Sequence, residues 1–311
     1  MEITRRADVK LGFACNNRCL FCAQGDRRDA CGAVPFEEVL ARLVTARSGS
    51  RSLVLTGGEP TLHRRIVAIV QAAAQLGFRP IQLQTNGRML AYRQVLDALM
   101  RAGLTEVSPS LHASTADVHD ALTRRPGSWE ESREGIRNAV DAGLPVVTNS
   151  VITRQNTHDL PALVAGLASL GVRRAQLAFV HPVGTAAQEF DAVVPRLPDV
   201  VAPLTEARRV AREAGVRLVT EAIPYCFLRG MDELAVEASI PETTVVEMRG
   251  EVFDYSQWRV AEGKAHGEPC ARCAERPRCE GPWREYPARF GWDEFVPVAA
   301  LHRAPLTASE T

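Results

Sequence analysis

Polar and hydrophobic positions along the chain form a repeating pattern with two parts. An amphipathic stretch of helical length ends near a glycine, and a short apolar stretch follows it. Glycine suits the left-handed turn that ends many helices. The pattern therefore predicts alternating helices and strands, with helix ends at Gly49, Gly77, Gly103, Gly143, Gly171 and Gly215.

The apolar stretches mark the predicted strands. Residues 9–13 form the first strand, directly before a loop that contains three cysteines. One helix start is visible in detail, because the segment Ser128-Trp129-Glu130-Glu131 fits a capping box. The other predicted strands cover residues 52–56, 80–85, 105–111, 145–152, 175–180 and 216–220.

Strands that alternate regularly with helices predict parallel βαβ units with right-handed crossovers, and therefore an α/β fold. Six or seven such units form either an open doubly wound sheet or a barrel, and the periodicity alone does not decide between them. In a barrel, reactive groups gather after the carboxyl ends of the strands. The alternation stops after Thr220, which predicts one domain over residues 1–220 and a smaller one over 221–311.

Composition and charge exclude several classes of function. The 311 residues are 46% hydrophobic, and 37 basic residues balance 37 acidic ones, so no net field favours nucleic acid or an anionic membrane. The N-terminus has no apolar run typical of a signal peptide, and no stretch is apolar enough to span a bilayer. Eight cysteines without an export signal indicate metal ligands in a reducing cytoplasm rather than disulfides.

The candidate chemistry centres on the loop after the first predicted strand. Cys15, Cys19 and Cys22 follow one another with three and then two residues between them. Thiolates this close converge on one metal centre, and three ligands leave one iron of a cubane cluster open to another ligand. A zinc site completed by Cys31 or by a distant histidine is the alternative.

The cysteine spacing, with Leu20 and Phe21 before the third cysteine, resembles the radical S-adenosylmethionine (SAM) superfamily. The resemblance implies a partial (β/α)6 barrel with a [4Fe–4S] cluster whose open iron binds SAM. It also implies reductive cleavage of SAM to methionine and a 5′-deoxyadenosyl radical, which removes a hydrogen atom from the substrate. Phe21 is then a cofactor-binding residue.

Residues after the other predicted strands extend this resemblance. Gly57-Gly58-Glu59 resembles the motif that binds the methionine amino group of SAM, and Thr85-Asn86-Gly87 resembles the segment that shapes the floor of the site. Two glycines also let a backbone pass close to a ligand. By analogy with family members, the remaining SAM contacts are Ser110, Asn149 and Val180.

Groups for acid–base chemistry are sought at the same strand ends. His112, His181 and Glu221 are the candidates for a base within reach of a substrate hydroxyl. Ser108, Ser110 and His112 alternate along the chain, which predicts that they share one strand face. A packed, hydrogen-bonded histidine is an equal alternative for His112, and a surface loop residue for His181. Arginines that suit an anionic substrate are Arg27, Arg28 and Arg88.

A second group of cysteines follows the regular alternation. Cys226, Cys270, Cys273 and Cys279 suit either a closed zinc site or a second [4Fe–4S] cluster. Their spacing resembles the C-terminal extension of SPASM and Twitch radical SAM enzymes, and matches the Twitch form because no cysteine follows Cys279. The molybdenum-cofactor cyclase resembles the chain in broad layout but differs in this second spacing.

The resemblance predicts an oxidoreductase supplied with electrons by a flavodoxin or ferredoxin. One hypothesis is the oxidation of a small molecule such as a sugar or cyclitol. Another is a maturase that forms C–S or C–C crosslinks in a ribosomally made peptide, although only about eight residues precede the first predicted strand. A non-catalytic iron–sulfur sensor is the third, and Gly58 and Glu59 have no purpose in it.

Overall fold

A computed structural model describes residues 5–25, 27–30 and 32–299, so Cys31 lies outside the described residues. Strands and helices alternate through most of the described chain, as the sequence predicts. The strands are β1 (Arg5–Lys10), β2 (Ser52–Thr56), β3 (Ile81–Thr85), β4 (Glu106–Pro109), β5 (Val147–Ile152), β6 (Arg174–Phe179), β7 (Arg217–Glu221), β8 (Glu242–Val246) and β9 (Val252–Asp254).

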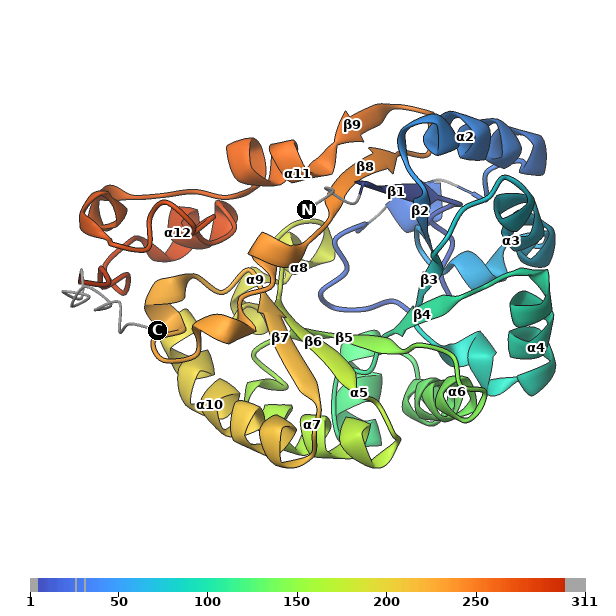
Figure 1. Ribbon diagram of the computed structural model, residues 1–311. Helices are drawn as coiled ribbons and strands as arrows, with labels where there is room; N and C mark the ends of the chain where they lie inside the picture. The colour runs from blue at the N-terminus through green and yellow to red at the C-terminus, as the bar shows by residue number, and fades with distance from the viewer. Residues whose placement is uncertain (1–4, 26, 31, 300–311) are drawn as a thin grey trace, which may run out of the picture.

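Most of the longer helices form an outer ring around these strands (Figure 1). Short 3₁₀ turns lie at several strand and helix ends, and a π-helical turn covers Arg259–Gly263. The α-helices are α1 (Arg27–Ala30), α2 (Phe36–Gly49), α3 (Ile66–Gln75), α4 (Arg93–Ala102), α5 (Ala116–Thr123), α6 (Ser128–Asp141), α7 (Leu160–Ser169), α8 (Thr185–Gln188), α9 (Phe190–Val193), α10 (Leu197–Glu213), α11 (Tyr255–Trp258) and α12 (Glu285–Phe290).

The strands form a parallel, curved sheet that encloses a lumen. One sheet has the order β4-β3-β2-β1-β8-β9 and the other β5-β6-β7, and a parallel bridge between Val107 and Val146 joins them. All pairs are parallel except β8 with β9. The sequence-based choice of a partial barrel over an open sheet is confirmed.

The first strand begins earlier than predicted. It covers Arg5–Lys10, whereas the apolar run had indicated residues 9–13. Ala7 and Val9 face the packed outer side, while Arg6, Asp8 and Lys10 line the lumen. A strand with a charged inner face contains no continuous apolar run, and the prediction relied on such runs. The start of β1 was therefore misplaced.

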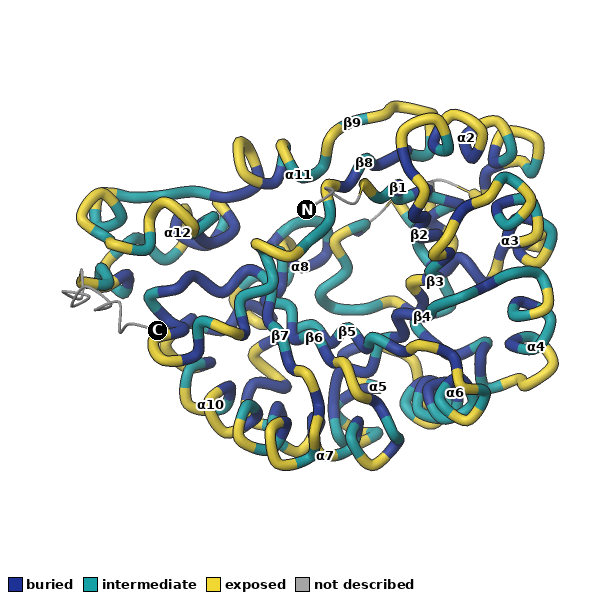
Figure 2. The backbone as a smooth tube through the Cα atoms, viewed as in Figure 1, coloured by how far each residue is buried: buried dark blue, intermediate teal, exposed yellow. Residues whose placement is uncertain are grey.

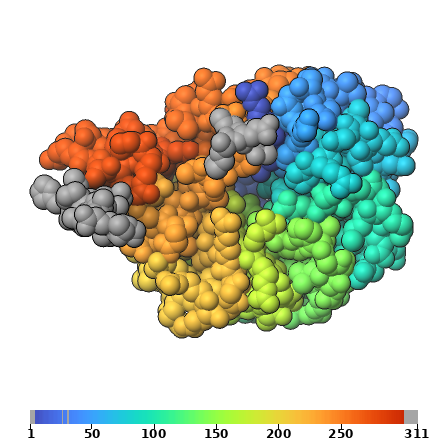
Figure 3. Space-filling view, viewed as in Figure 1, coloured from blue at the N-terminus to red at the C-terminus, as the bar shows by residue number. Residues whose placement is uncertain are grey.

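The sheet continues across the predicted domain boundary. Residue 220 lies inside β7, and β8 from the predicted second domain pairs in parallel with β1. The later residues, orange to red in Figure 3, form a lobe beside the last strands and helices of the barrel. The division at residue 220 therefore stays a prediction.

The hydrophobic core lies between the sheet and the ring of helices (Figure 2). Leu55 on β2 and Leu83 on β3 are fully buried, as are Leu96 on α4 and Leu163 on α7. The glycines predicted to end helices have a left-handed φ, with one exception. Gly49 is itself the last residue of α2, and its φ is not left-handed.

The predicted capping box at the start of α6 is wrong. Gly127 is the N-cap residue, and no side chain of its own caps the helix. Instead Asp120 on α5 accepts hydrogen bonds from Gly127 N, Ser128 Oγ and Trp129 N, at 2.6–2.8 Å. These bonds outweigh the effect of burial and lower the pKa of Asp120. The cap is therefore a tertiary contact that local sequence does not encode.

Replacement of this cap tests its contribution to stability. We expect Asp120→Ala to lower the free energy of unfolding by about 1–2 kcal/mol, because three donors lose their acceptor. Asp141→Ala at the exposed end of the same helix is the matched control, with a change within about 0.5 kcal/mol. Urea denaturation measures both, and equal effects would contradict the assignment.

Candidate active site

The cysteine loop (residues 14–25) is held at its base by the Gly-Gly segment after β2. Gly58 N donates to Gly12 O and Glu59 N donates to Ala14 O, both at 2.8 Å. A Cβ atom on Gly57 would lie 2.1 Å from Gly12 O, and one on Gly58 would lie 2.2 Å from Phe13 O. The glycines are thus needed here for contact with the loop backbone itself, which is a different reason from the predicted approach of a ligand.

The carboxylate of Glu59 connects the ends of β2 and β3. Glu59 is buried, and its Oε1 accepts from Thr61 N at 3.0 Å and from Thr85 Oγ1 at 2.7 Å. Its Oε2 accepts from Asn86 N at 2.6 Å. Burial raises the pKa of Glu59, and these hydrogen bonds partly oppose the rise. The role of Glu59 toward SAM stays a prediction.

The segment after β3 contacts the middle of the cysteine loop. Asn86 Nδ2 donates to Asn16 Oδ1 at 2.6 Å. Arg88 is buried and donates to Asn16 O at 2.7 Å and to Asn17 Oδ1 at 2.9 Å, while its Nε pairs with Glu131. The segment that was predicted to shape the floor of the site therefore supports the middle of the cysteine loop through hydrogen bonds.

Two further segments fix the rest of the loop. Arg18 N and Leu20 N donate to backbone carbonyls at the end of α5, both at 2.9 Å. At the far end of the loop, Thr185 N donates to Cys22 O at 2.9 Å, and a Cβ on Gly184 would lie 2.6 Å from the same oxygen. The loop that carries three cysteines is consequently fixed along its length.

The thiols of this loop lie in a partly buried setting that disfavours free thiolates. Burial raises the pKa of Cys15 to about 11, and burial followed by the neighbouring thiols raises the pKa of Cys19. Arg28, whose buried Nε has no hydrogen-bond partner among the described residues, opposes both shifts. Iron cations would supply the missing positive charge, so the donor set fits the predicted cluster.

The other arginines considered for an anionic substrate have protein partners. Arg27 pairs with Glu247 at 2.7 Å, and its guanidinium lies 4.2 Å from the centre of the Phe13 ring. Arg88 is engaged by the cysteine loop, as described above. Binding of an anion by either side chain would first require loss of these contacts.

His112 and Phe21 pack together beside the cysteine loop. Their rings meet edge to face at 4.6 Å, and His112 Nδ1 accepts from Val151 N at 3.2 Å. On its other side His112 stacks on His119, and burial holds the pKa of His112 well below its ordinary value. The geometry favours the alternative of a packed, hydrogen-bonded histidine, since His112 is absent from the described cavity lining.

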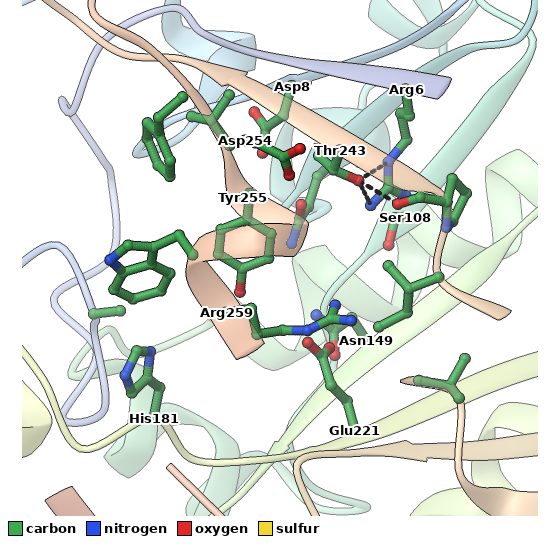
Figure 4. A pocket seen from close by; sticks show the side chains of 18 of the residues that line it. Arg6, Asp8, Ser108, Asn149, His181, Glu221, Thr243, Asp254, Tyr255 and Arg259 are labelled. Carbon is green, nitrogen blue, oxygen red and sulfur yellow. Dashed lines mark hydrogen bonds between the residues drawn. The ribbon is translucent and has the colours of Figure 1, made fainter. Parts of the chain in front are cut away.

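A cavity of about 1040 Å³ fills the barrel lumen next to the end of the cysteine loop, where Ala23 and Gln24 form part of its wall. Ligand pockets for drug-sized molecules usually measure about 300–1,000 Å³, so this volume suits a cofactor together with a second molecule. Inward-facing residues of β1 and β3–β8 line it, with Tyr255 and Arg259 closing one side (Figure 4).

Several residues predicted for SAM binding lie at or near this cavity. Asn149 lines it, and its buried Oδ1 has no hydrogen-bond partner among the described residues. Such an acceptor fits a ribose hydroxyl. Ser110 and Val180 belong to the adjoining backbone, where their N–H groups donate to Thr85 O and Ile152 O. The predicted common face is wrong for Ser110 and His112, because β4 ends at Pro109 and only Ser108 lines the cavity.

Two of the three predicted base candidates lie in the cavity wall. Glu221 Oε2 accepts from Gln176 Nε2 at 2.6 Å. His181 stacks on Trp283 with ring centres 3.8 Å apart, and its Nε2 lies 3.6 Å from Glu285. The alternative of a surface loop residue is therefore wrong for His181.

A buried lysine also contacts the Trp283 ring on which His181 stacks. The ammonium of Lys264 is 4.1 Å from the ring centre and has no hydrogen-bond partner in the described part of the chain. Burial lowers the pKa of Lys264, and the nearby Glu237 and Glu221 oppose the shift. No sequence pattern indicated this arrangement.

Other cavity-lining residues were also not predicted from the sequence. They face the cavity from a strand or from the segment after β9. A polar residue at every second position of β1 and β3 was the available signal. These cavity-lining residues are Arg6, Asp8, Lys10, Gln82, Gln84, Gln176, Tyr255 and Arg259.

The second group of cysteines lines one small pocket. Cys226, Cys270, Cys273 and Cys279 all line it, together with Tyr225 and other residues. Burial, followed by the other thiols, raises the pKa of Cys226 to about 12. Residues distant in sequence thus form a four-thiol site, which fits a fully protein-ligated metal centre.

The contact between Gly58 and the cysteine loop generates a stability test. We expect Gly58→Ala to lower the free energy of unfolding by about 3 kcal/mol, since its Cβ would overlap two carbonyl oxygens. Gly166→Ala is the matched control, because no atom lies within 4 Å of its Cβ position in α7 and alanine favours helix by about 0.5–1 kcal/mol. If urea denaturation shows that Gly58→Ala leaves the free energy of unfolding unchanged, the packing role of Gly58 is refuted.

The stacked histidines generate a pH dependence. Burial lowers the pKa of His119 from 6.5 to about 4, so in this window the unfolded chain binds a proton that the folded chain excludes. Stability is therefore lost as the pH falls below 6.5. Between pH 7 and pH 5 we expect the wild type to lose about 2 kcal/mol more than His119→Asn, whose amide oxygen replaces the Nδ1 acceptor.

Urea denaturation at the two pH values measures this difference. His158→Asn at an exposed position is the matched control and should retain the full pH dependence of the wild type. A His119→Asn variant as sensitive to acid as the wild type would disprove the assignment.

Curated proteins are similar in sequence to part of this chain. A probable GTP 3′,8-cyclase from Saccharolobus solfataricus is 35% identical over 184 residues, which are 58% of this chain and 59% of the relative. The chain thus matches less than two thirds of the length of these curated relatives. Within the described residues, no helix is long and apolar enough to cross a membrane.

Solved structures share the fold over most of the chain. Streptococcus suis SuiB bound to SAM matches with a TM-score of 0.65 and 17% identity, over 90% of this chain and 73% of SuiB. Native anSMEcpe with bound AdoMet matches with a TM-score of 0.66 and 14% identity, over 94% and 93% of the two chains. At these identities the likeness concerns the fold alone. Residues 9–165 match the profile of the Radical SAM superfamily, and because this is more than half of the 311 residues, the chain belongs to that superfamily of enzymes.

Proposed function

We propose that this radical SAM enzyme oxidises a polar small molecule in the barrel lumen, with a second iron–sulfur cluster in the four-cysteine pocket. The observation that carries the proposal is the polar cavity of about 1040 Å³ between the cysteine loop and the C-terminal segment. An ordinary closed barrel is filled by branched apolar side chains, whereas this lumen is lined by charges and amides.

The chain's own residues have separate tasks in this proposal. Cys15, Cys19 and Cys22 hold the first cluster, and Asn149 Oδ1 accepts from the SAM ribose. When bound, SAM and the two clusters would supply the redox chemistry that removes one hydrogen atom and one further electron from a substrate carbinol. His181 or Glu221 accepts the hydroxyl proton, so an alcohol becomes a ketone. A flavodoxin or ferredoxin supplies the initiating electron.

The arrangement of the second thiol group supports iron–sulfur over zinc. Four thiolates on one zinc ion lie about 3.8 Å apart, given Zn–S bonds of about 2.3 Å. Within the described ranges, no three His, Cys, Asp or Glu side chains converge closely enough for a single ion. A four-iron cluster spreads its four thiolate ligands further apart than one zinc ion does, which agrees with this spacing.

Peptide modification is the second candidate. SuiB has been solved with its precursor peptide SuiA, and anSMEcpe with the Cp18Cys peptide. The present chain shares their fold, and β9 forms an edge of the sheet to which an extended peptide can add. The lumen favours the small molecule, since charged and amide side chains of β1, β3, β5, β6 and β7 line it.

Iron content and SAM cleavage test the proposal together. We expect anaerobically reconstituted protein to contain about eight iron atoms per chain and to form 5′-deoxyadenosine from SAM with dithionite. Cys19→Ala should abolish cleavage, because it removes a ligand of the first cluster. Cys270→Ala with Cys273→Ala should reduce iron to about four atoms per chain while uncoupled cleavage continues.

Matched substitutions outside both thiol groups control for damage to the fold. Ser48→Ala at an exposed position of α2 should leave iron content and cleavage unchanged. Zinc in the four-cysteine pocket would disprove the auxiliary cluster, and absence of 5′-deoxyadenosine from fully loaded protein would disprove the proposed chemistry.

A further inference from the structure

One buried side chain in the cavity wall has a hydrogen-bond donor that the protein does not use. Arg259 is 3% exposed, and its Nε and Nη2 donate to the two carboxylate oxygens of Glu280 at 2.8 and 2.7 Å. Its Nη1 is buried without a partner among the described residues. A buried donor of this kind costs free energy unless an acceptor is supplied, so a ligand oxygen at this point would be favourable.

Glu221 lies beside Arg259 in the same wall, although the two residues come from separate elements (Figure 4). Its carboxylate accepts one hydrogen bond, from the neutral amide of Gln176. In the described part of the chain, no basic side chain forms an ion pair with it. Asn149, proposed above for the SAM ribose, lines the same cavity. An unused donor and an underused carboxylate therefore adjoin the proposed SAM region.

The charges around the cavity disfavour a strongly anionic ligand. Three basic side chains face five carboxylates in the lining. Lys10 pairs with Asp8 inside it, while Arg259 pairs with Glu280 and Glu247 pairs with Arg27, both of these partners lying outside the lining. A phosphate would satisfy Arg259 Nη1 but would place further negative charge beside Glu221, and the two like charges would repel each other. The carboxylates of the lining are Asp8, Glu221, Glu247, Asp254 and Glu262.

We infer that Arg259 and Glu221 form a substrate subsite for a hydroxyl and a neighbouring amine of a polyhydroxylated small molecule. The hydroxyl oxygen accepts from Arg259 Nη1, and the ammonium donates to the Glu221 carboxylate. This inference rests on the proposed function and specifies its substrate class. It gives Glu221 a binding role, which leaves His181 as the proton acceptor, and it excludes a nucleoside triphosphate.

Equilibrium binding to anaerobically reconstituted protein with SAM tests the subsite without turnover. The probes are glucosamine, glucose, glucose 6-phosphate and GTP, measured by isothermal titration calorimetry. We expect glucosamine to bind about 10-fold tighter than glucose, which corresponds to one charge-assisted hydrogen bond. Glucose 6-phosphate and GTP should bind more weakly than glucose.

Substitutions locate the preference. Glu221→Gln keeps the bond from Gln176 but removes the charge, so glucosamine should bind no tighter than glucose. Glu221→Asp keeps the charge and should retain a preference for glucosamine, and Arg259→Lys should weaken both sugars because the free Nη1 is lost. Glu37→Gln on the exposed surface of α2 is the matched control. Urea midpoints equal to the wild type confirm that each variant folds.

The outcomes separate the subsite from the chemistry. Equal binding of glucose and glucosamine, tightest binding of GTP or glucose 6-phosphate, or no binding of any probe would overturn the subsite, even where SAM is cleaved to 5′-deoxyadenosine. A glucosamine preference that depends on the Glu221 charge, in protein that forms no 5′-deoxyadenosine, would support the subsite and overturn the proposed function.

Discussion

The site depends on how firmly the protein holds the backbone of the cysteine loop. Segments after β2, β3 and β6 contact it, together with the end of α5, largely through backbone hydrogen bonds. Gly57, Gly58 and Gly184 permit these contacts because a Cβ at any of them would overlap a carbonyl oxygen. A loop fixed in this way presents its thiols with little entropy left to lose when a cluster binds.

A polar lumen is the second constraint on the fold. The outward faces of the strands pack against helices and supply most of the core, so the inward faces are free to carry charges and amides. Such groups are tolerated because many of them bond to one another, as Lys10 does with Asp8 and Gln176 with Glu221. Those left over, at Asn149 and Arg259, point to where a ligand completes the hydrogen bonding.

Sequence patterns predicted what is local and failed where distant segments meet. Strands β2 to β7 were located to within about two residues, because alternating apolar runs and helix-ending glycines are local signals, whereas β8 and β9 were not predicted. β1 was misplaced because its lumen face is charged, and the cap of α6 because Asp120 comes from another helix. Cysteine spacing indicated both thiol groups, but no pattern indicated that Arg259 or Lys264 would be buried beside the lumen.

The chain next to the second thiol group contacts the wall of the cavity directly. Glu280 follows Cys279 directly in the chain, and it binds Arg259 through two hydrogen bonds in a buried setting. Loss of either partner would leave an uncompensated buried charge, so this pair fixes the position of Arg259 relative to the second thiol group. The stack of His181 on Trp283 provides a second contact of the same kind, since Trp283 lies only a few residues beyond Cys279. The C-terminal segment therefore both completes the four-cysteine pocket and shapes the lumen.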